Sequence, residues 1–437
     1  MATLVPSARR RLAEPMRAKV AKLVALVALV AALALPGVAV PGRASAGQVA
    51  AVTGGVTGPA DGSATGRLSP ALVPAGAAFR GRGAPVAPKV PQGMLSGVSC
   101  PSPASCMAVG DQALAMWWDG STWAVHAARS YGPYPPSFAS VSCPTATFCM
   151  AVGSYTGGSP GHFLPARPVA ELWDGHAWGI EPVPLPKGRA YGVLTSVSCR
   201  SPSWCMAVGS SGAVPLAERW DGKSWAGTPV ASVEGANGAT LSVSCPGTGT
   251  CLAAGYYNRG LGSAAAVLPL AERWDGAGWH VLATPALGGS SWSGFNSVSC
   301  TGPQSCMAAG YYVCRGCAAR NATMAASWAG AKWAYLTVPT HVGANSYLNG
   351  VSCASRASCA AVGNWGDGGV MAELWDGRSW SQVPVALPPD PGANGALDAV
   401  SCPVAGFCMA VGYYSGSGAP NQALAERWDG HRWSWAM

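Results

Sequence analysis

The chain has 437 residues, a net charge of +8 and few charged side chains (11%), but 58 glycines, 19 tryptophans and 16 cysteines. This composition is typical of β-structure with many turns and disulfides, and it excludes a helical enzyme or a wholly disordered chain. Seven of the 27 basic residues and one of the 19 acidic residues lie in the first 46 positions, which leaves 20 and 18 in the remainder. The near-neutral remainder carries no electrostatic footprint for nucleic acid.

The first 46 residues have the parts of a secretory signal. Basic residues precede the apolar run LVALVALVAALAL at 23–35, and the small-residue site Ala44-Ser45-Ala46 follows. This pattern predicts export and cleavage after residue 46. The run is short for a membrane span, which needs about 20 residues, and an uncleaved N-terminal membrane tether stays the alternative. Residues 47–94 are rich in Ala, Gly, Pro and Val without an apolar period, which predicts a disordered linker.

One motif repeats seven times after the linker. Its leading VSC cysteines lie 43, 56, 46, 55, 53 and 49 residues apart, and each is followed six positions later by a second cysteine. The units begin near residues 97, 140, 196, 242, 297, 350 and 399. Seven units of this length are typical of propeller blades. The sequence therefore predicts an all-β fold, a seven-bladed β-propeller of four-stranded antiparallel blades over residues 95–437.

Each unit has the pattern of four short strands, and its two cysteines flank the first hairpin. Cysteines placed this way lie opposite each other at an expected Cα separation of about 4.5–5.5 Å, within disulfide range. We predict one such disulfide in each blade and an eighth in a CxxC loop of the fifth unit. No metal-ligand spacing accompanies them, so neither a metal nor a cofactor is predicted. The predicted pairs are Cys100–Cys106, Cys143–Cys149, Cys199–Cys205, Cys245–Cys251, Cys300–Cys306, Cys353–Cys359, Cys402–Cys408 and Cys314–Cys317.

Fourteen of the 19 tryptophans flank the turn between the third and fourth strands, as Trp220 and Trp225 do. The first two strands of each unit carry small residues instead. Blades are crowded near the propeller axis and splay apart at the perimeter, so side-chain volume has to grow outward. We therefore place these tryptophans in the outer core and not in a carbohydrate site.

The order VSC…MAVG…LAERWDGKSW resembles the repeats of Asp-box (BNR-type) propellers, which include sialidases and propeller-type photosystem II assembly factors. The turn from Asp221 to Trp225 is one residue shorter than an Asp-box and lacks its leading Ser or Thr. Arrays of the form SCxSxxxCxAVG…AERWxGxxW in uncharacterised exported bacterial proteins are similar along all seven units. That resemblance implies secretion and a propeller-like array, and it implies no reaction.

Loops of variable length are expected on one face of the propeller. In an antiparallel blade the cysteine hairpins and the Asp-Gly turns share one end, and the other loops share the opposite end. Variable loops on a rigid scaffold are where binding usually resides. Aromatic residues just past the AVG glycine are predicted there, either as ligand contacts or as packing between blades. They are Tyr155, Tyr256, Tyr257, Tyr311, Tyr312, Trp365, Tyr413 and Tyr414.

A glutamate recurs in the third strand of five units, and a residue repeated around a ring indicates structural pairing with a neighbouring blade or its hydroxyl groups. No catalytic residue is predicted at these positions, which are Glu171, Glu218, Glu272, Glu373 and Glu426.

The sequence thus predicts a secreted, monomeric binding module for a polysaccharide, a cell-wall component or a protein. No nucleic-acid partner and no membrane span after signal cleavage are expected. The alternative is an extracellular glycoside hydrolase or lyase of the sialidase-like propeller type, which needs arginines and carboxylates that converge near the axis. The variable loops hold such side chains without a catalytic motif to mark them: Asp111, Glu181, Glu234, Arg259, Arg315, Asp367 and Asp390.

Overall fold

The computed structural model describes residues 90–437 apart from 132–133, 160–161, 213, 232, 234–235, 261–265, 285–286, 288–289, 291, 315–319, 342, 367, 386, 389–393 and 417–418. The predicted signal sequence (1–46) lies outside these residues, as does the predicted linker (47–94) up to residue 89. Within the described part, no long apolar helix of the kind that spans a bilayer is found.

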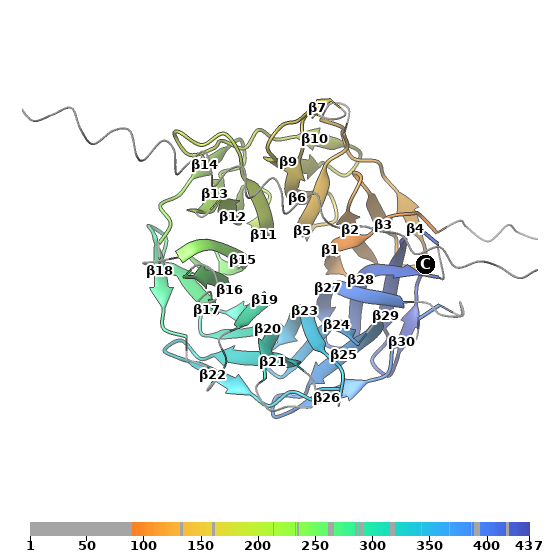
Figure 1. The fold of residues 1–437 in the computed structure, drawn as a ribbon. Coiled ribbons are helices and arrows are strands. Elements are labelled where there is room, and N and C mark those ends of the chain that lie inside the picture. The colour runs from red at the N-terminus through yellow and green to blue at the C-terminus, as the bar shows by residue number, and fades with distance from the viewer. Residues whose placement is uncertain are drawn as a thin grey trace, which may run out of the picture. The chain divides into compact units, whose positions relative to one another are not determined.

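Seven four-stranded antiparallel sheets, each built from one repeat of the chain, surround a common axis (Figure 1). The first strands, nearest the axis, are β1 (Leu95–Ser102), β5 (Ser137–Thr145), β11 (Val193–Ser201), β15 (Ala236–Gly247), β19 (Ser293–Gly302), β23 (Ser346–Ser355) and β27 (Asn394–Val404). The second strands are β2 (Ser105–Gly110), β6 (Phe148–Tyr155), β12 (Trp204–Ser211), β16 (Thr250–Arg259), β20 (Ser305–Val313), β24 (Ser358–Trp365) and β28 (Phe407–Ser415).

The third strands are β3 (Ala115–Trp118), β9 (Arg167–Trp173), β13 (Val214–Trp220), β17 (Ala266–Trp274), β21 (Asn321–Trp328), β25 (Gly369–Trp375) and β29 (Gln422–Trp428). The fourth strands, at the perimeter, are β4 (Trp123–Val125), β10 (Trp178–Ile180), β14 (Trp225–Gly227), β18 (Trp279–Leu282), β22 (Trp333–Leu336), β26 (Trp380–Val383) and β30 (Trp433–Trp435). A small hairpin, β7 (Gly158–Ser159) and β8 (His162–Phe163), lies in the loop between β6 and β9.

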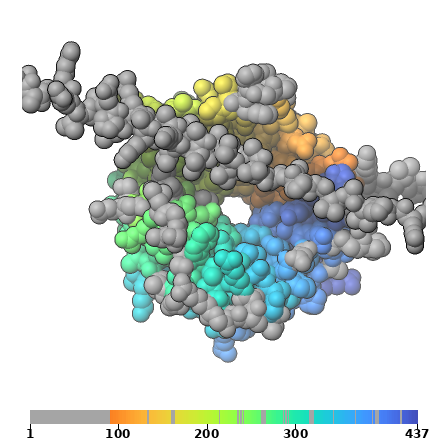
Figure 2. Space-filling model, viewed as in Figure 1, coloured from red at the N-terminus to blue at the C-terminus, as the bar shows by residue number. Residues whose placement is uncertain are grey.

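The predicted seven-bladed propeller is confirmed. The first sheet is β1–β2–β3–β4 and the last is β27–β28–β29–β30, so every blade is complete within its own repeat. The space-filling view shows an opening at the centre of the ring (Figure 2).

The seven blade disulfides are present, with Cα–Cα separations of 3.9–4.1 Å. These separations are shorter than expected because each pair lies where the strands approach most closely, at a position without ladder hydrogen bonds. The Cys199 N–H accordingly bonds outside its own blade, to Ser142 Oγ. Cys314 is also disulfide-bonded, and its predicted partner Cys317 lies outside the described residues.

The serine of each VSC joins its blade to the next one. At all seven junctions its Oγ accepts the N–H of the next blade's leading cysteine at 2.9–3.0 Å. The bond from Cys100 N to Ser401 Oγ (3.0 Å) links the first blade to the seventh and completes the circle. The innermost strands are sheet edges, whose N–H groups need partners outside their own sheet, and the repeated serine supplies them.

The glycine that ends the AVG or AAG motif of the second strand faces a β-bulge in the first strand in six of the seven blades. There the strand register shifts by one residue, as it does between Leu397 and Ala399. A Cβ on Gly412 would lie only 2.0 Å from the carbonyl oxygen of Ala396. The bulge therefore requires glycine opposite it. The fourth blade pairs through this region without a shift, with Leu241 opposite Gly255.

The tryptophans pack as the radial size gradient predicts. In each blade the third-strand and fourth-strand tryptophans pair with ring centroids 5.6–5.9 Å apart. Twelve of the fourteen are buried, and Trp123 and Trp375 are partly buried.

The turn between them is held by its aspartate in six blades, where Oδ1 accepts the backbone N–H groups two and three residues further on at 2.8–3.0 Å. These backbone bonds lower the pKa of the Asp119 and Asp275 carboxyls to about 2.

Residues ahead of β1 take part in the seam, which is the junction between the seventh and first blades. The Ala423 N–H donates to the carbonyl oxygen of Pro91 at 3.0 Å, and the Gly93 N–H donates to that of Asn421 at 2.9 Å. Gln92 pairs with Gln422 of β29. The chain entering the first blade thus contacts the third strand of the last.

Candidate functional site

The two ends of the blades differ as the sequence predicts. On one face, Trp118 Nε1 beside the Asp-Gly turn donates to the carbonyl oxygen of Pro103 in the cysteine hairpin at 3.2 Å. Trp220 Nε1 makes the same bond to Pro202 at 3.1 Å. The loops after the second strands, and the connectors that run from each fourth strand to the next first strand, therefore share the opposite face. We call it the variable face.

Five of the eight predicted aromatic residues lie two positions past the AVG glycine and pack into the cores between blades. Tyr155 stacks on Tyr131 of a connector with centroids 4.8 Å apart, and Trp365 stacks on His341 of another at 4.1 Å. Tyr414 is buried, and its hydroxyl donates to Gln422 Oε1 at 3.0 Å. The other four are half-buried. The five are Tyr155, Tyr257, Tyr312, Trp365 and Tyr414.

The remaining three, Tyr256, Tyr311 and Tyr413, lie one position past the glycine and are half-buried. Tyr311 packs edge-on against Tyr347 of the next blade with centroids 5.0 Å apart. Burial, reinforced by the nearby Tyr256 and Tyr347 hydroxyls, raises the pKa of Tyr311. The structure thus brings together Tyr256, Tyr311 and Tyr347, of which the sequence reasoning missed Tyr347.

Among the described residues, two aromatic side chains of the variable face are well exposed, and the sequence reasoning missed both. Tyr191 is 43% exposed and Trp292 is 45% exposed, and each lies one or two residues before a first strand. Leu164, in the loop after β8, is 57% exposed on the same face. The signal that could have found them is their place in connectors, where nothing in the repeat constrains the side chain.

The five repeated glutamates are buried, with 0–2% of each residue exposed. Burial raises their pKa, to about 7 for Glu171, Glu218 and Glu272 and to about 8 for Glu373 and Glu426. Glu171 Oε2 accepts the backbone N–H of Arg129 at 2.9 Å, so its pairing comes from a connector. Neither carboxylate oxygen of Glu373 or Glu426 has a hydrogen-bond partner in the described part of the chain.

The charged residues that a hydrolase would need are spread over different blades. Asp111 Oδ1 accepts the N–H of Met94 at 2.7 Å and so holds the entry to the first blade. Glu181 lies in the connector after β10, where burial raises its pKa, and Arg259 is exposed at the end of β16. The described residues contain no cluster of three metal-ligand side chains. Glu234, Arg315, Asp367 and Asp390 lie outside the described residues.

The bulged residues of the first strands line the central channel, a cavity of about 240 Å³. Thr195 Oγ1 donates to the carbonyl oxygen of Leu241 at 2.7 Å, and Asn349 Nδ2 donates to that of Leu397 at 3.1 Å, so each bridges to the next blade. Asp398 occupies the same position in the seventh blade, and burial raises its pKa to about 6. The channel wall is therefore polar and differs from blade to blade.

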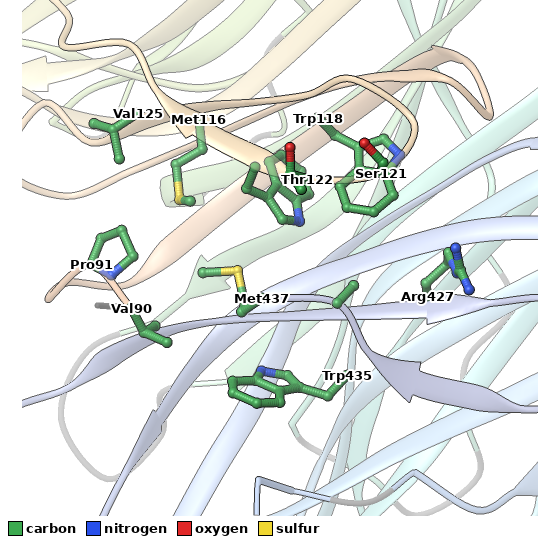
Figure 3. Close-up of a pocket in the computed structure, with 12 residues that line it drawn as sticks. Val90, Pro91, Met116, Trp118, Ser121, Thr122, Val125, Arg427, Trp435 and Met437 are labelled. Carbon is green, nitrogen blue, oxygen red and sulfur yellow. The ribbon is translucent and has the colours of Figure 1, made fainter. Parts of the chain in front are cut away.

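A larger cavity, of about 500 Å³, opens at the perimeter of the seam (Figure 3). Trp118 and Val125 line it from the first blade, and Trp435 lines it from the seventh. Met116 and Met437 point toward one another between them (Figure 3). Val125 is 56% exposed and Trp435 is 44% exposed, so apolar surface faces solvent here. We call this cavity the seam groove; its volume is that of a small-ligand pocket.

No protein-family model and no curated protein matches the chain. Among solved structures it is similar to YCF48 from Cyanidioschyzon merolae, with 14% identity over 76% of this chain and 95% of that chain and a TM-score of 0.48. It is also similar to YCF48 bound to D1 peptide (16% identity, 78% and 94% covered, TM-score 0.48) and to the RRP9 WD40 repeats (10%, 76% and 94%, TM-score 0.49). No family model supports the resemblance to Asp-box propellers that the order of the repeat motifs suggested.

Proposed function

We propose that this protein is a secreted binding module whose variable face recognises a partner protein, a polysaccharide or a cell-wall component. The observation that carries the proposal is the exposure of Trp292 and Tyr191 on connectors of a rigid ring. Aromatic side chains present a large flat area at little cost in conformational entropy, which suits both sugar and protein contacts. The half-buried Tyr256, Tyr311 and Tyr413 would contribute phenolic hydroxyl groups to the same face.

The seven disulfides support export, because such bonds persist in oxidising compartments. Intact-mass measurement of protein secreted by an expressing bacterium is expected to show a chain that begins at Gly47. Full-length chain recovered only with the membranes would instead identify residues 23–35 as an anchor.

Binding to arrays of glycans, cell-wall polymers and displayed proteins tests the recognition itself. We expect the double variant Trp292→Ala/Tyr191→Ala to lose at least tenfold in retention of whichever ligand the native protein binds. Val281→Ala is the matched control, since Val281 is equally exposed (46%) but lies on the outer strand β18. Equal losses in both variants would contradict a site on the variable face.

A further inference from the structure

Six of the seven junctions between blades are filled by the chain's own connectors. At each one an apolar connector residue packs against the core between the two blades: Ala128, Val183, Val230, Leu287, Val338 and Val385. At the junction of the first two blades the connector also bonds along the outer strands, where Arg129 Nε donates to the carbonyl oxygen of Trp178 at 2.9 Å. The groove between neighbouring outer strands is thus a place that an extended segment occupies.

The seam is the junction that no connector crosses, because its two blades are the two ends of the array. Ala436 repeats the first step of a connector, since its N–H donates to the carbonyl oxygen of Ala425 at 2.9 Å just as that of His126 donates to Ala115 at 2.9 Å. Among the described residues, Met437 and Val90 partly fill the groove beyond this point. About 500 Å³ remains, whereas the cavity beside the connector residue Ala231 measures about 230 Å³.

The wall of the groove differs from that of the filled junction between the first two blades. Met116 holds the position at which Glu171 accepts the N–H of its connector. Methionine at position 116 makes the wall of the groove apolar and adaptable. Trp118 and Trp435 supply aromatic surface around it (Figure 3), and Trp123 is a further lining residue.

The connectors also indicate what fits such a groove. Three of them place Pro-Val directly after the fourth strand, in the sequences EPVPLP at 181–186, TPVASV at 228–233 and VPVALP at 383–388. Proline-containing extended segments are recognised by aromatic-lined grooves because they lose little entropy on binding. We propose that the seam groove binds an extended, proline-containing apolar segment of a partner protein, in the place that connectors take at the other six junctions.

Fluorescence anisotropy with a labelled EPVPLP peptide and the full-length chain tests this proposal. We expect saturable binding, at least tenfold weaker for Trp435→Ala, a position whose side chain is 44% exposed. Met116→Glu is expected to abolish binding, and Met116→Leu is expected to preserve it. A peptide with serine in place of its valine and leucine should not bind. Absence of binding at millimolar peptide, or equal binding by native chain and Trp435→Ala, would overturn the proposal.

Two further variants separate this site from other possibilities. Trp292→Ala on the variable face is expected to leave peptide binding unchanged, so failure of the variable-face function and of this inference are distinguishable. Residues 84–88 of the chain itself, APVAP, have a similar composition. The substitution Val86→Asp in the full-length chain places a charge in this segment. If the peptide binds this variant but not the native chain, the chain's own segment occupies the groove and a partner segment is excluded.

Discussion

At the scale of single residues, the residue type at each repeated position is constrained by a hydrogen bond or by a steric contact. The Ser401 hydroxyl accepts the N–H of the next blade's cysteine, the Asp429 carboxylate accepts two turn N–H groups, and Gly412 admits a carbonyl oxygen where a Cβ would be. Tyr191 and Trp292 lie outside this repeated pattern, and their side chains are exposed.

Replacing Gly412 by alanine is expected to cost at least ~3 kcal/mol of unfolding free energy. The added methyl group would lie 2.0 Å from the Ala396 carbonyl oxygen, so the bulged strand β27 has to move. Gly406→Ala is the control, since nothing lies within 4 Å of a Cβ there. Equilibrium denaturation with urea measures both, and similar values for the two variants would contradict the role given to the bulge.

Replacing Glu373 by glutamine is expected to raise the unfolding temperature at pH 8 and to change it little at pH 4.5. Burial raises the pKa of this carboxyl from 4.5 to about 8. The folded state therefore favours the protonated acid, and stability falls as the pH rises from about 4.5 through 8. Glutamine cannot ionise, so the variant escapes this loss.

Glu171→Gln is the companion variant for that measurement. Its carboxylate accepts the Arg129 N–H, and its pKa rises only to about 7, so its gain at pH 8 should be smaller. Thermal unfolding at half-unit pH intervals gives both curves. A wild-type chain whose stability does not fall between pH 5 and pH 8 would contradict the raised pKa values of the buried glutamates.

At the scale of elements, the first hairpin and the Asp-Gly turn brace one end of each blade. The disulfide closes a seven-residue hairpin, which is worth roughly 2 kcal/mol in the chain-entropy account. The third-strand indole reaches across to the hairpin, as Trp118 does to Pro103. The opposite end has no such cross-link in the repeat pattern, which is why its loops tolerate different lengths.

We expect the native protein to show no titratable thiol with a maleimide probe at pH 7. The described cysteines are all in disulfides. After mild reduction and alkylation, unfolding should shift to lower denaturant concentration with the slope of the transition retained. Several reactive thiols in the untreated protein would contradict the prediction of one closed bridge in each blade.

The ring of blades, the blade disulfides and the outward increase in side-chain volume could all be predicted from the repeat. The reason is that the same cysteines and tryptophans recur at the same spacing in seven units. The sequence left ligand contact and packing between blades as alternatives for Tyr155 and Tyr414, and in the structure both pack into the cores between blades. Trp292 carries no repeated signal, so sequence spacing could not show its exposure. The seam groove is lined by residues more than 300 positions apart, such as Met116 and Trp435, and a periodic pattern does not encode which of them meet.

At the scale of the whole molecule, the ring is closed by non-covalent contacts at the seam. The Cys100–Ser401 hydrogen bond, the pairing of Gln92 with Gln422 and the core around Leu95 hold the first blade to the last. Every other junction has the same serine bond and a covalent connector besides. The seam is therefore the junction at which partial opening costs least.

Ser401→Ala is expected to destabilise the fold by ~1–3 kcal/mol, since the Cys100 N–H is left without its acceptor. Ser198→Ala removes the equivalent bond to Cys245 at an internal junction and serves as the comparison. Hydrogen exchange should speed up along β1 and β27 in the seam variant, but only near Cys245 in the internal one. Equal, local effects in both would show that the connectors add nothing to the junctions.

The circle of serine–cysteine bonds runs in one rotational sense, so every blade presents an acceptor to the neighbour ahead and a donor to the neighbour behind. These hydrogen bonds do not themselves determine that the ring has seven blades. A gene that gained or lost a unit by duplication or deletion would still produce matching edges at every contact. The wedge angle set by the perimeter tryptophans then decides how many units complete a turn.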